Sequence, residues 1–193
     1  MKRNRPKFKQ IIDAAVVVIA ENGFHQAQVS KIARQAGVAD GTIYLYFKNK
    51  EDILISLFED KMGQFIEKIE QDIAGKSNSV EKLLALVKMH LCQLANDPNL
   101  AIVTQIELRQ SDHELRFKIN EVLKGYIKII DQVLYQGIEE GLFKKDLNVK
   151  LARQMIFGTL DEVVTNWVMN EQKYDLRETI EPIHKLLIDG IRV

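Results

Sequence analysis

Apolar residues recur along this 193-residue chain every three or four positions rather than every second position. A repeat of that length places apolar side chains on one face of an α-helix, whereas strict alternation would indicate strands. Proline, which interrupts helices, occurs at only three positions. The pattern predicts an all-α fold of about nine helices, over residues 8–22, 29–36, 40–47, 50–73, 80–96, 99–110, 113–140, 148–170 and 176–190.

Residues that cap helices mark several of these boundaries. The pair Asn22-Gly23 suits the end of the first helix, because glycine readily adopts the left-handed conformation that follows many helices. Asp40 is expected to be the N-cap of the third helix. Asn49, with Asp52 three residues later, resembles a capping pair for the long fourth helix.

The second and third predicted helices are short and are joined by the segment AGVA, which is typical of a helix-turn-helix. Ile43 and Phe47 are four residues apart, so both should face the core together with Ile32 and Ala33. The other side chains of the third helix should then point wholly or partly outward: Thr42, Tyr44, Leu45 and Tyr46.

Exposed tyrosines on a short helix suit a nucleic-acid surface. A phenol can hydrogen-bond a phosphate while its ring packs on a sugar or a thymine methyl group. We expect free backbone amides at Gly41 and Thr42 to face phosphate oxygens, and Lys48 and Lys50 to add electrostatic attraction. An isolated aromatic cluster of this kind is more often core, so its context decides.

Charge supplies that context. Residues 1–50 hold nine Lys or Arg and three Asp or Glu, a net charge of +6, whereas residues 51–193 hold 18 and 24, a net charge of −6. A basic N-terminal segment in a chain that is neutral overall favours an anionic partner. Part of this charge lies in an N-terminal basic arm: Lys2, Arg3, Arg5, Lys7 and Lys9.

The segment GFHQAQVSKIARQAGVADGTIYLYFKNKEDIL closely resembles the DNA-binding motif of the tetracycline-repressor (TetR) family of bacterial transcription regulators. The resemblance covers about residues 8–58. It implies a helix-turn-helix DNA-binding domain at 1–49 and an all-α ligand-binding and dimerisation domain at 50–193. One departure is that Ala27 and Gln28 stand where the family often has a Ser or Thr cap. Carried over by position, the DNA contacts would be Ser30, Gly41, Thr42, Tyr44, Leu45, Tyr46 and Lys50.

The second half of the chain carries two broad apolar faces, over residues 119–134 and 155–168. Ordinary core packing explains any single residue there, although together the faces permit a long apolar cavity. Four basic residues nearby could pair with a ligand's carboxylate or phosphates. Each of them could equally be a solvated charge on a helix or the partner of a neighbouring carboxylate. These basic residues are Arg109, Arg116, Lys124 and Arg153.

Two further segments, AIVTQIELRQSDHELRFKINEVLKGY and LARQMIFGTLDEVVTNWVMNEQKYDL, are similar to those of TetR family members that repress fatty-acid degradation genes. That resemblance implies a homodimer that long-chain acyl-CoA releases from operator DNA, with no cofactor beyond this effector. We hypothesise that the acyl chain lies between the helices of 99–110, 113–140 and 148–170, and that Arg109, Arg116 or Arg153 meets the coenzyme A phosphates. The candidate ligand residues are Arg109, Arg116, Tyr126, Ile130, Arg153, Phe157 and Trp167.

A two-fold operator requires a two-fold protein, so we expect a dimer interface within about 148–192, formed as a four-helix bundle. The same apolar faces could instead be core within one chain. The candidate interface residues are Leu151, Met155, Leu160, Trp167, Ile180, Ile183, Leu187 and Ile191.

Other functional classes find little support. The four histidines, His25, His90, His113 and His184, lie on different predicted segments without metal-ligand spacing, and no phosphate loop or nucleophile elbow is present. We therefore expect no metal and no enzyme. With one cysteine and no apolar block of signal or membrane-span length, we expect a cytoplasmic protein. The alternative within the family is a repressor of an efflux gene that answers to another lipophilic ligand.

Overall fold

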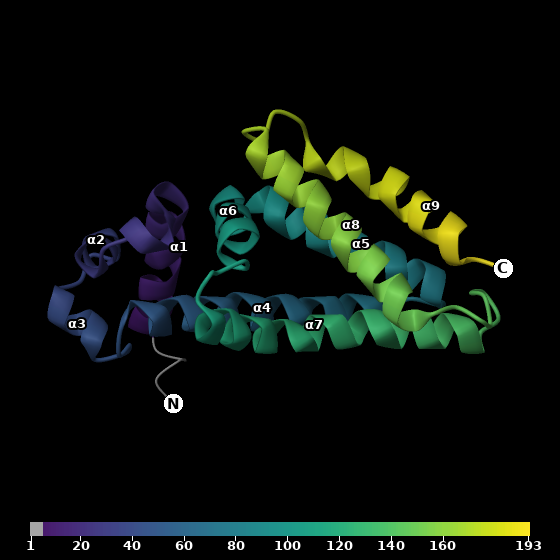
Figure 1. Ribbon diagram of the computed structural model, residues 1–193, viewed down its shortest axis with the longest axis horizontal. Coiled ribbons are helices and arrows are strands. Elements are labelled where there is room, and N and C mark those ends of the chain that lie inside the picture. Colours follow the sequence, from purple (N-terminus) through teal and green to yellow (C-terminus); the bar gives the residue numbers. More distant parts are fainter. Residues whose placement is uncertain (1–5) are drawn as a thin grey trace. The chain divides into compact units, whose positions relative to one another are not determined.

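Helix boundaries follow the predicted periodicity closely in the computed structural model, which describes residues 6–193 (Figure 1). Those residues include no β-strand, so the all-α prediction is confirmed. The elements are α1 (Pro6–Gln26), α2 (Val29–Gln35), α3 (Asp40–Tyr44), α4 (Lys50–Ala74), α5 (Ser79–Asn96), α6 (Pro98–Glu107), α7 (His113–Glu139), α8 (Val149–Met169), the 3-10 helix η1 (Leu176–Thr179) and α9 (Ile180–Ile191).

Two of the predicted helix ends are confirmed. Gly23 interrupts α1 with φ 71° and ψ 154°, so the regular helix ends at the predicted glycine and a short turn follows. At the start of α4, the side-chain oxygen of Asn49 accepts the Asp52 N–H at 2.8 Å. The Asp52 carboxylate in turn accepts the Lys48 N–H at 2.9 Å. The polar caps thus fix where α4 begins.

The prediction for the start of α3 was wrong by one residue. Ala39 is the N-cap, with extended backbone and no side-chain capping hydrogen bond, and Asp40 is the first helical residue. Its carboxylate stands in the first turn, where negative charge complements the helix dipole. The Thr42 N–H donates to the Ala39 carbonyl at 2.8 Å, so this amide is not free for a phosphate as we expected.

The described chain forms two compact units, and both α4 and α7 contribute to each of them. The first unit consists of the described residues up to Gly63 together with Asn99–Val122. The second consists of Gln64–Pro98 and Leu123–Val193. The helix-turn-helix therefore folds together with α6 and the beginning of α7, and the expected domain boundary after residue 49 stays a prediction.

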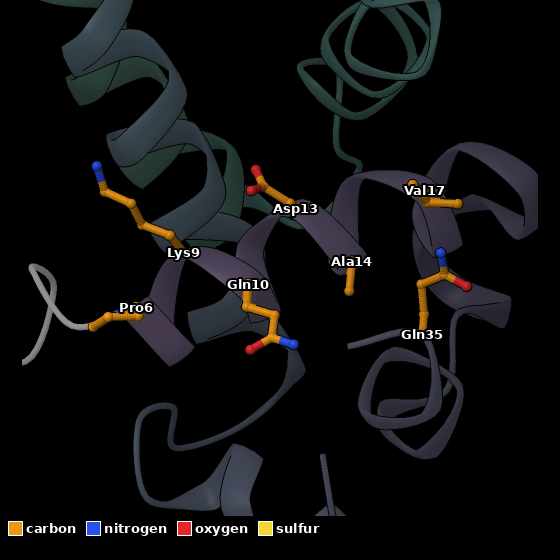
Figure 2. Close-up of a pocket in the computed structure, with 7 residues that line it drawn as sticks. All are labelled: Pro6, Lys9, Gln10, Asp13, Ala14, Val17 and Gln35. Carbon is orange, nitrogen blue, oxygen red and sulfur yellow. The ribbon is translucent and has the colours of Figure 1, made fainter. Parts of the chain in front are cut away.

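In the first unit, α1 packs on α2 and α2 packs on α3 (Figure 1). The Phe8 and Phe47 rings stack with centroids 5.2 Å apart, and Ile32 and Ile43 are buried, as their spacing predicts. An open hollow of about 500 Å³ lies on this unit. Figure 2 shows its lining residues, which come mainly from α1, with Gln35 from α2. Of the basic arm, Lys2, Arg3 and Arg5 lie outside the described residues.

In the second unit, α5 packs against α8, η1 and α9 (Figure 1). A close approach of α4 and α7 occurs at Gly125, where a Cβ atom would come within 2.7 Å of the Ile66 side chain. Over the part of the chain that the structure describes, no helix is both long and apolar enough to span a membrane.

Candidate functional sites

The outward face of α3 is the first candidate site. Tyr44 and Leu45 expose 59% and 66% of their surfaces, whereas Ile43 and Phe47 are buried. Large apolar and aromatic side chains exposed side by side are unusual on a surface without a partner. The predicted orientation of this helix is therefore confirmed.

The remaining predicted DNA contacts differ in how accessible they are. Ser30 and Gly41 are exposed, and Thr42 and Tyr46 are half-buried. Gln28 caps α2 through its backbone alone, without a side-chain hydrogen bond, as the departure from the family pattern indicated. Exposed polar and small residues near a helix start suit contact with a phosphate backbone.

Lys50 has partners within its own unit. Its ammonium group donates to the His25 carbonyl at 2.9 Å and lies 4.7 Å from the centroid of the Phe24 ring. These contacts fasten the first turn of α4 to the turn that ends α1. Lys50, a predicted DNA contact, therefore also holds two elements of its own unit together.

Glu107, at the end of α6, joins the same region. Its buried carboxylate accepts the Phe24 backbone N–H at 2.9 Å and is also hydrogen-bonded by the Gln110 side chain. In the sequence, Glu107 is only one of several carboxylates close to the candidate arginines. The actual partner lies 83 residues away in the sequence, so no local pattern could have shown the contact.

An aromatic cluster in the second unit is the second candidate site. Tyr126 of α7 and Phe157 of α8, both predicted ligand residues, have ring centroids 6.1 Å apart. Phe65 of α4 lies 5.2 Å from Tyr126 and 6.0 Å from His90 of α5. Sequence reasoning missed Phe65 and His90, because only the packing of four helices brings these rings together.

His90 and Tyr126 form the polar centre of this cluster. The His90 Nδ1 atom lies 2.9 Å from the Tyr126 hydroxyl oxygen, and both side chains are buried. Burial disfavours charge, so it lowers the pKa of His90 to about 4 and raises the pKa of the Tyr126 phenol. Both groups are therefore neutral at pH 7.

The predicted arginines are held by partners that the sequence did not indicate. Arg153 forms an ion pair with Asp131 at 2.7 Å. Arg116 donates to the Gln110 carbonyl at 2.8 Å, and Arg109 donates to the Gln105 carbonyl at the same distance. Arg109 and Arg116 belong to the first unit and Arg153 to the second. Their assignment to coenzyme A phosphates stays a prediction.

The two other predicted ligand residues lie in the core of the second unit. Ile130 is fully buried in α7. Trp167 is also buried, and its indole N–H donates to the Tyr174 carbonyl at 2.8 Å. The hydrogen bond holds the end of α8 against the segment that leads into η1. Among residues 6–193, no group of three or more His, Cys, Asp or Glu side chains is placed to hold a metal ion.

The expected dimer residues fall into two sets. Leu151 and Met155 of α8 are exposed, as an interface requires. The other six are buried within the chain itself, because α8, α9 and α5 pack together, and the intrachain alternative holds for them: Leu160, Trp167, Ile180, Ile183, Leu187 and Ile191. Leu186 of α9, which exposes 72% of its surface, was not among the candidates.

Both parts of the chain are similar to known protein families. A family model described as bacterial regulatory proteins of the tetR family matches residues 11–57, and a model described as the C-terminal region of YsiA-like proteins matches residues 58–190. The fatty acid metabolism regulator protein of Bacillus subtilis (strain 168) is 66% identical over 191 residues, which are 99% of this chain and 98% of that protein.

Solved structures agree with this comparison. The fatty acid degradation regulator FadR of Bacillus halodurans is 63% identical, with a TM-score of 0.93 over 96% of this chain and 100% of that chain. FadR of Bacillus subtilis in complex with stearoyl-CoA is 65% identical, with the same TM-score and coverage. Both similarities extend across the helix-turn-helix and the helices that follow it.

Proposed function

Because the chain belongs to the TetR family of bacterial regulatory proteins, we propose that it represses fatty-acid degradation genes as a homodimer and leaves its operator when it binds long-chain acyl-CoA. The observation that carries the effector assignment is 65% identity, over 96% of this chain, to a regulator whose structure contains stearoyl-CoA. The protein is a transcription regulator and not an enzyme. We place it in the cytoplasm, where the DNA is.

DNA recognition in this proposal rests on the exposed face of α3. Tyr44 and Leu45 would enter the major groove, and Ser30 and Gly41 would lie against the phosphate backbone. Neither Tyr nor Leu makes the bidentate base contact that Arg or Gln makes. Specificity would therefore draw on apolar contacts and on DNA shape.

Dimerisation would use the exposed side chains of α8 and α9 rather than their buried faces. Leu151, Met155 and Leu186 expose apolar surface on two helices that pack against each other. The same pair of helices from a second copy would complete a four-helix bundle. Light scattering should give twice the 22.2 kDa chain mass. Leu186→Glu should yield monomers, whereas Lys185→Glu, an exposed neighbour on α9, should not.

The aromatic cluster supports an effector with a long apolar chain. Phe65, Tyr126 and Phe157 come from three helices, and the Tyr126 ring centroid lies 5.2 Å from that of Phe65 and 6.1 Å from that of Phe157. Aromatic side chains suit contact with an acyl chain, because apolar contact requires no directional partner. The phosphates of coenzyme A would require cations, and the arginines remain the candidates for that contact.

The test is a titration of operator occupancy. Duplex DNA from the gene's own promoter is immobilised, protein is bound at fixed salt, and stearoyl-CoA, stearate or coenzyme A is added. We expect stearoyl-CoA alone to weaken DNA affinity by about 5- to 150-fold. A duplex with scrambled half-sites is the matched control. DNA that stays bound with all three additions would overturn the effector assignment and favour the efflux-repressor alternative.

A further inference from the structure

The hydrogen-bonded pair of His90 and Tyr126 is buried among aromatic side chains. Tyr126 is almost completely buried, and His90 is more than nine-tenths buried. Their ring centroids are 5.6 Å apart, with Phe65 beside both and Phe157 beside Tyr126. Polar side chains in such surroundings require partners for every polar atom.

The chemistry of the two groups fixes which atom carries the proton. A neutral imidazole nitrogen is a stronger acceptor than a phenol oxygen, so the Tyr126 O–H donates to His90 Nδ1 across 2.9 Å. The ring is neutral because its pKa is lowered to about 4, so it carries a single proton. We therefore assign that proton to Nε2, so that His90 has one N–H donor on the side of its ring away from Tyr126.

This donor lacks an acceptor in the part of the chain that the structure describes. His90 Nε2 is fully buried and has no hydrogen-bond partner among residues 6–193. A buried N–H without an acceptor destabilises a protein, whereas Phe or Leu at this position would not. The position of this N–H in an aromatic cluster indicates that its acceptor arrives with a ligand that is otherwise apolar.

The acyl part of a long-chain acyl-CoA has one such atom. Its hydrocarbon chain has no polar group until the thioester, whose carbonyl oxygen accepts hydrogen bonds and cannot donate them. A free fatty acid would instead bring a carboxylate, which an aromatic site without a cation stabilises poorly. A single neutral donor therefore favours binding of a thioester over binding of a free fatty acid.

We propose that His90 Nε2–H donates to the thioester carbonyl oxygen of a bound long-chain acyl-CoA, and that Tyr126 positions His90 by fixing its tautomer. The proposal rests on the proposed function, because it takes the effector to be an acyl-CoA. His90 is then a specificity-determining residue, and the aromatic rings of Phe65 and Phe157 lie along the first part of the chain.

Two ligands and two variants test the proposal by direct calorimetric binding to the full-length protein. The ligands are stearoyl-CoA and S-octadecyl-CoA, a thioether that has the same chain length but no carbonyl oxygen. The wild type should bind the thioester about 5- to 30-fold more tightly than the thioether. His90→Phe should bind the two ligands equally, because the donor is gone.

Tyr126→Phe and Phe157→Leu complete the design. Tyr126→Phe should reduce the thioester preference without abolishing it, since the tautomer is then no longer fixed. Phe157→Leu changes the packing alone and should weaken both ligands by the same factor. His90→Gln, which keeps an N–H donor, should retain part of the preference. His90→Leu, which also lacks a donor, replaces His90→Phe if that variant does not fold.

Three results would overturn the assignment. Equal affinity of the wild type for thioester and thioether would remove His90 from thioester recognition while leaving an acyl-CoA effector in place. An undiminished preference in His90→Phe would do the same. A wild type that binds neither ligand would reject the proposed effector and this assignment together.

Discussion

Tyr44 is the predicted DNA contact whose replacement tests the proposed DNA-binding face of α3 most directly. More than half of its surface is accessible, although Ile43 and Phe47 beside it are buried. Because its side chain supports little of the core, its removal should leave folding intact. Contact of its phenol and ring with DNA would explain why such a large aromatic side chain is exposed on α3.

We expect Tyr44→Ala to weaken operator binding by at least about 10-fold, since each protomer of a dimer loses a hydrogen bond to phosphate and a ring contact. Fluorescence anisotropy at fixed salt measures the affinity, and a thermal melt checks the fold. Tyr135→Ala, which removes a similarly exposed tyrosine from α7, is the matched control. Operator affinity equal to that of the wild type would exclude Tyr44 from the interface.

His90 predicts a specific dependence of stability on pH. Burial lowers the pKa of His90 from 6.5 to about 4 in the folded protein, so below about pH 6.5 the unfolded state binds a proton that the folded state does not. The free energy of unfolding should therefore fall as pH drops from about 6.5 to about 4, by roughly 3 kcal/mol in all, and the loss should level off below that.

Urea unfolding at several pH values measures this loss. His90→Phe should have a flatter profile over the same window, because it has no imidazole to protonate in the unfolded chain. The difference between the two profiles isolates His90 from the carboxylates, which titrate in both proteins. Parallel profiles would contradict the burial of a neutral ring.

For single residues, the sequence predicts well which side chains of a helix are buried, but it does not predict which side chains from different helices meet. Helical spacing placed Ile43 and Phe47 inward and Tyr44 and Leu45 outward, and each is found so. His90 was one of four histidines on separate segments, and a lone histidine carries no signal of its surroundings. Its neighbours, Phe65 and Tyr126, come from helices at sequence separations of 25 and 36 residues, which no local pattern can read.

At the scale of elements, α6 is tied to α1 by the buried hydrogen bond from the Phe24 N–H to Glu107. Lys50 adds a second tie at the same turn, through the His25 carbonyl and the Phe24 ring. A displacement of α6 would therefore act directly on the turn that leads into the helix-turn-helix. This turn is therefore in contact with both α4 and α6.

Glu107→Ala should lower the free energy of unfolding by about 1–3 kcal/mol, because it leaves the buried Phe24 N–H without its acceptor. Amide hydrogen exchange at Phe24 should accelerate accordingly. Glu107→Gln keeps a side-chain oxygen at this position and should lose less. Exchange at Phe24 that is unchanged in Glu107→Ala would show that the bond contributes little.

Helix positions were predictable because periodicity and caps are local. Asn49 and Asp52 marked the start of α4, and Gly23 marked the end of regular α1. Asp40 was misassigned because Asp is favoured both at the N-cap and in the first turn, and the sequence does not distinguish these positions. The extended backbone at Ala39 decides between them.

For the whole molecule, the arrangement of units was not predictable from the chain. Asn99–Val122 folds with the helix-turn-helix although it follows α4 and α5 in sequence. Composition and motif predict a boundary near residue 49, and the two family matches meet between residues 57 and 58. The distant contact of Glu107 with Phe24 is one physical reason why α6 joins the first unit.

A regulator built this way must link two binding equilibria. If acyl-CoA lowers operator affinity by some factor, the operator must lower acyl-CoA affinity by the same factor, because the coupling free energy is reciprocal. If the ligand instead acted as a detergent and aggregated the protein, or if an impurity displaced the DNA, the two affinities would not change by the same factor. Reciprocity therefore separates allosteric release from trivial loss of DNA binding.

The most direct measurement is the affinity of stearoyl-CoA for the protein alone and for the protein saturated with operator duplex, by calorimetry at one salt concentration. We expect binding to be about 5- to 150-fold weaker in the presence of operator, by a factor equal to that found in the DNA titration. A scrambled duplex at the same concentration should have no effect. Equal stearoyl-CoA affinity with and without operator would contradict the account.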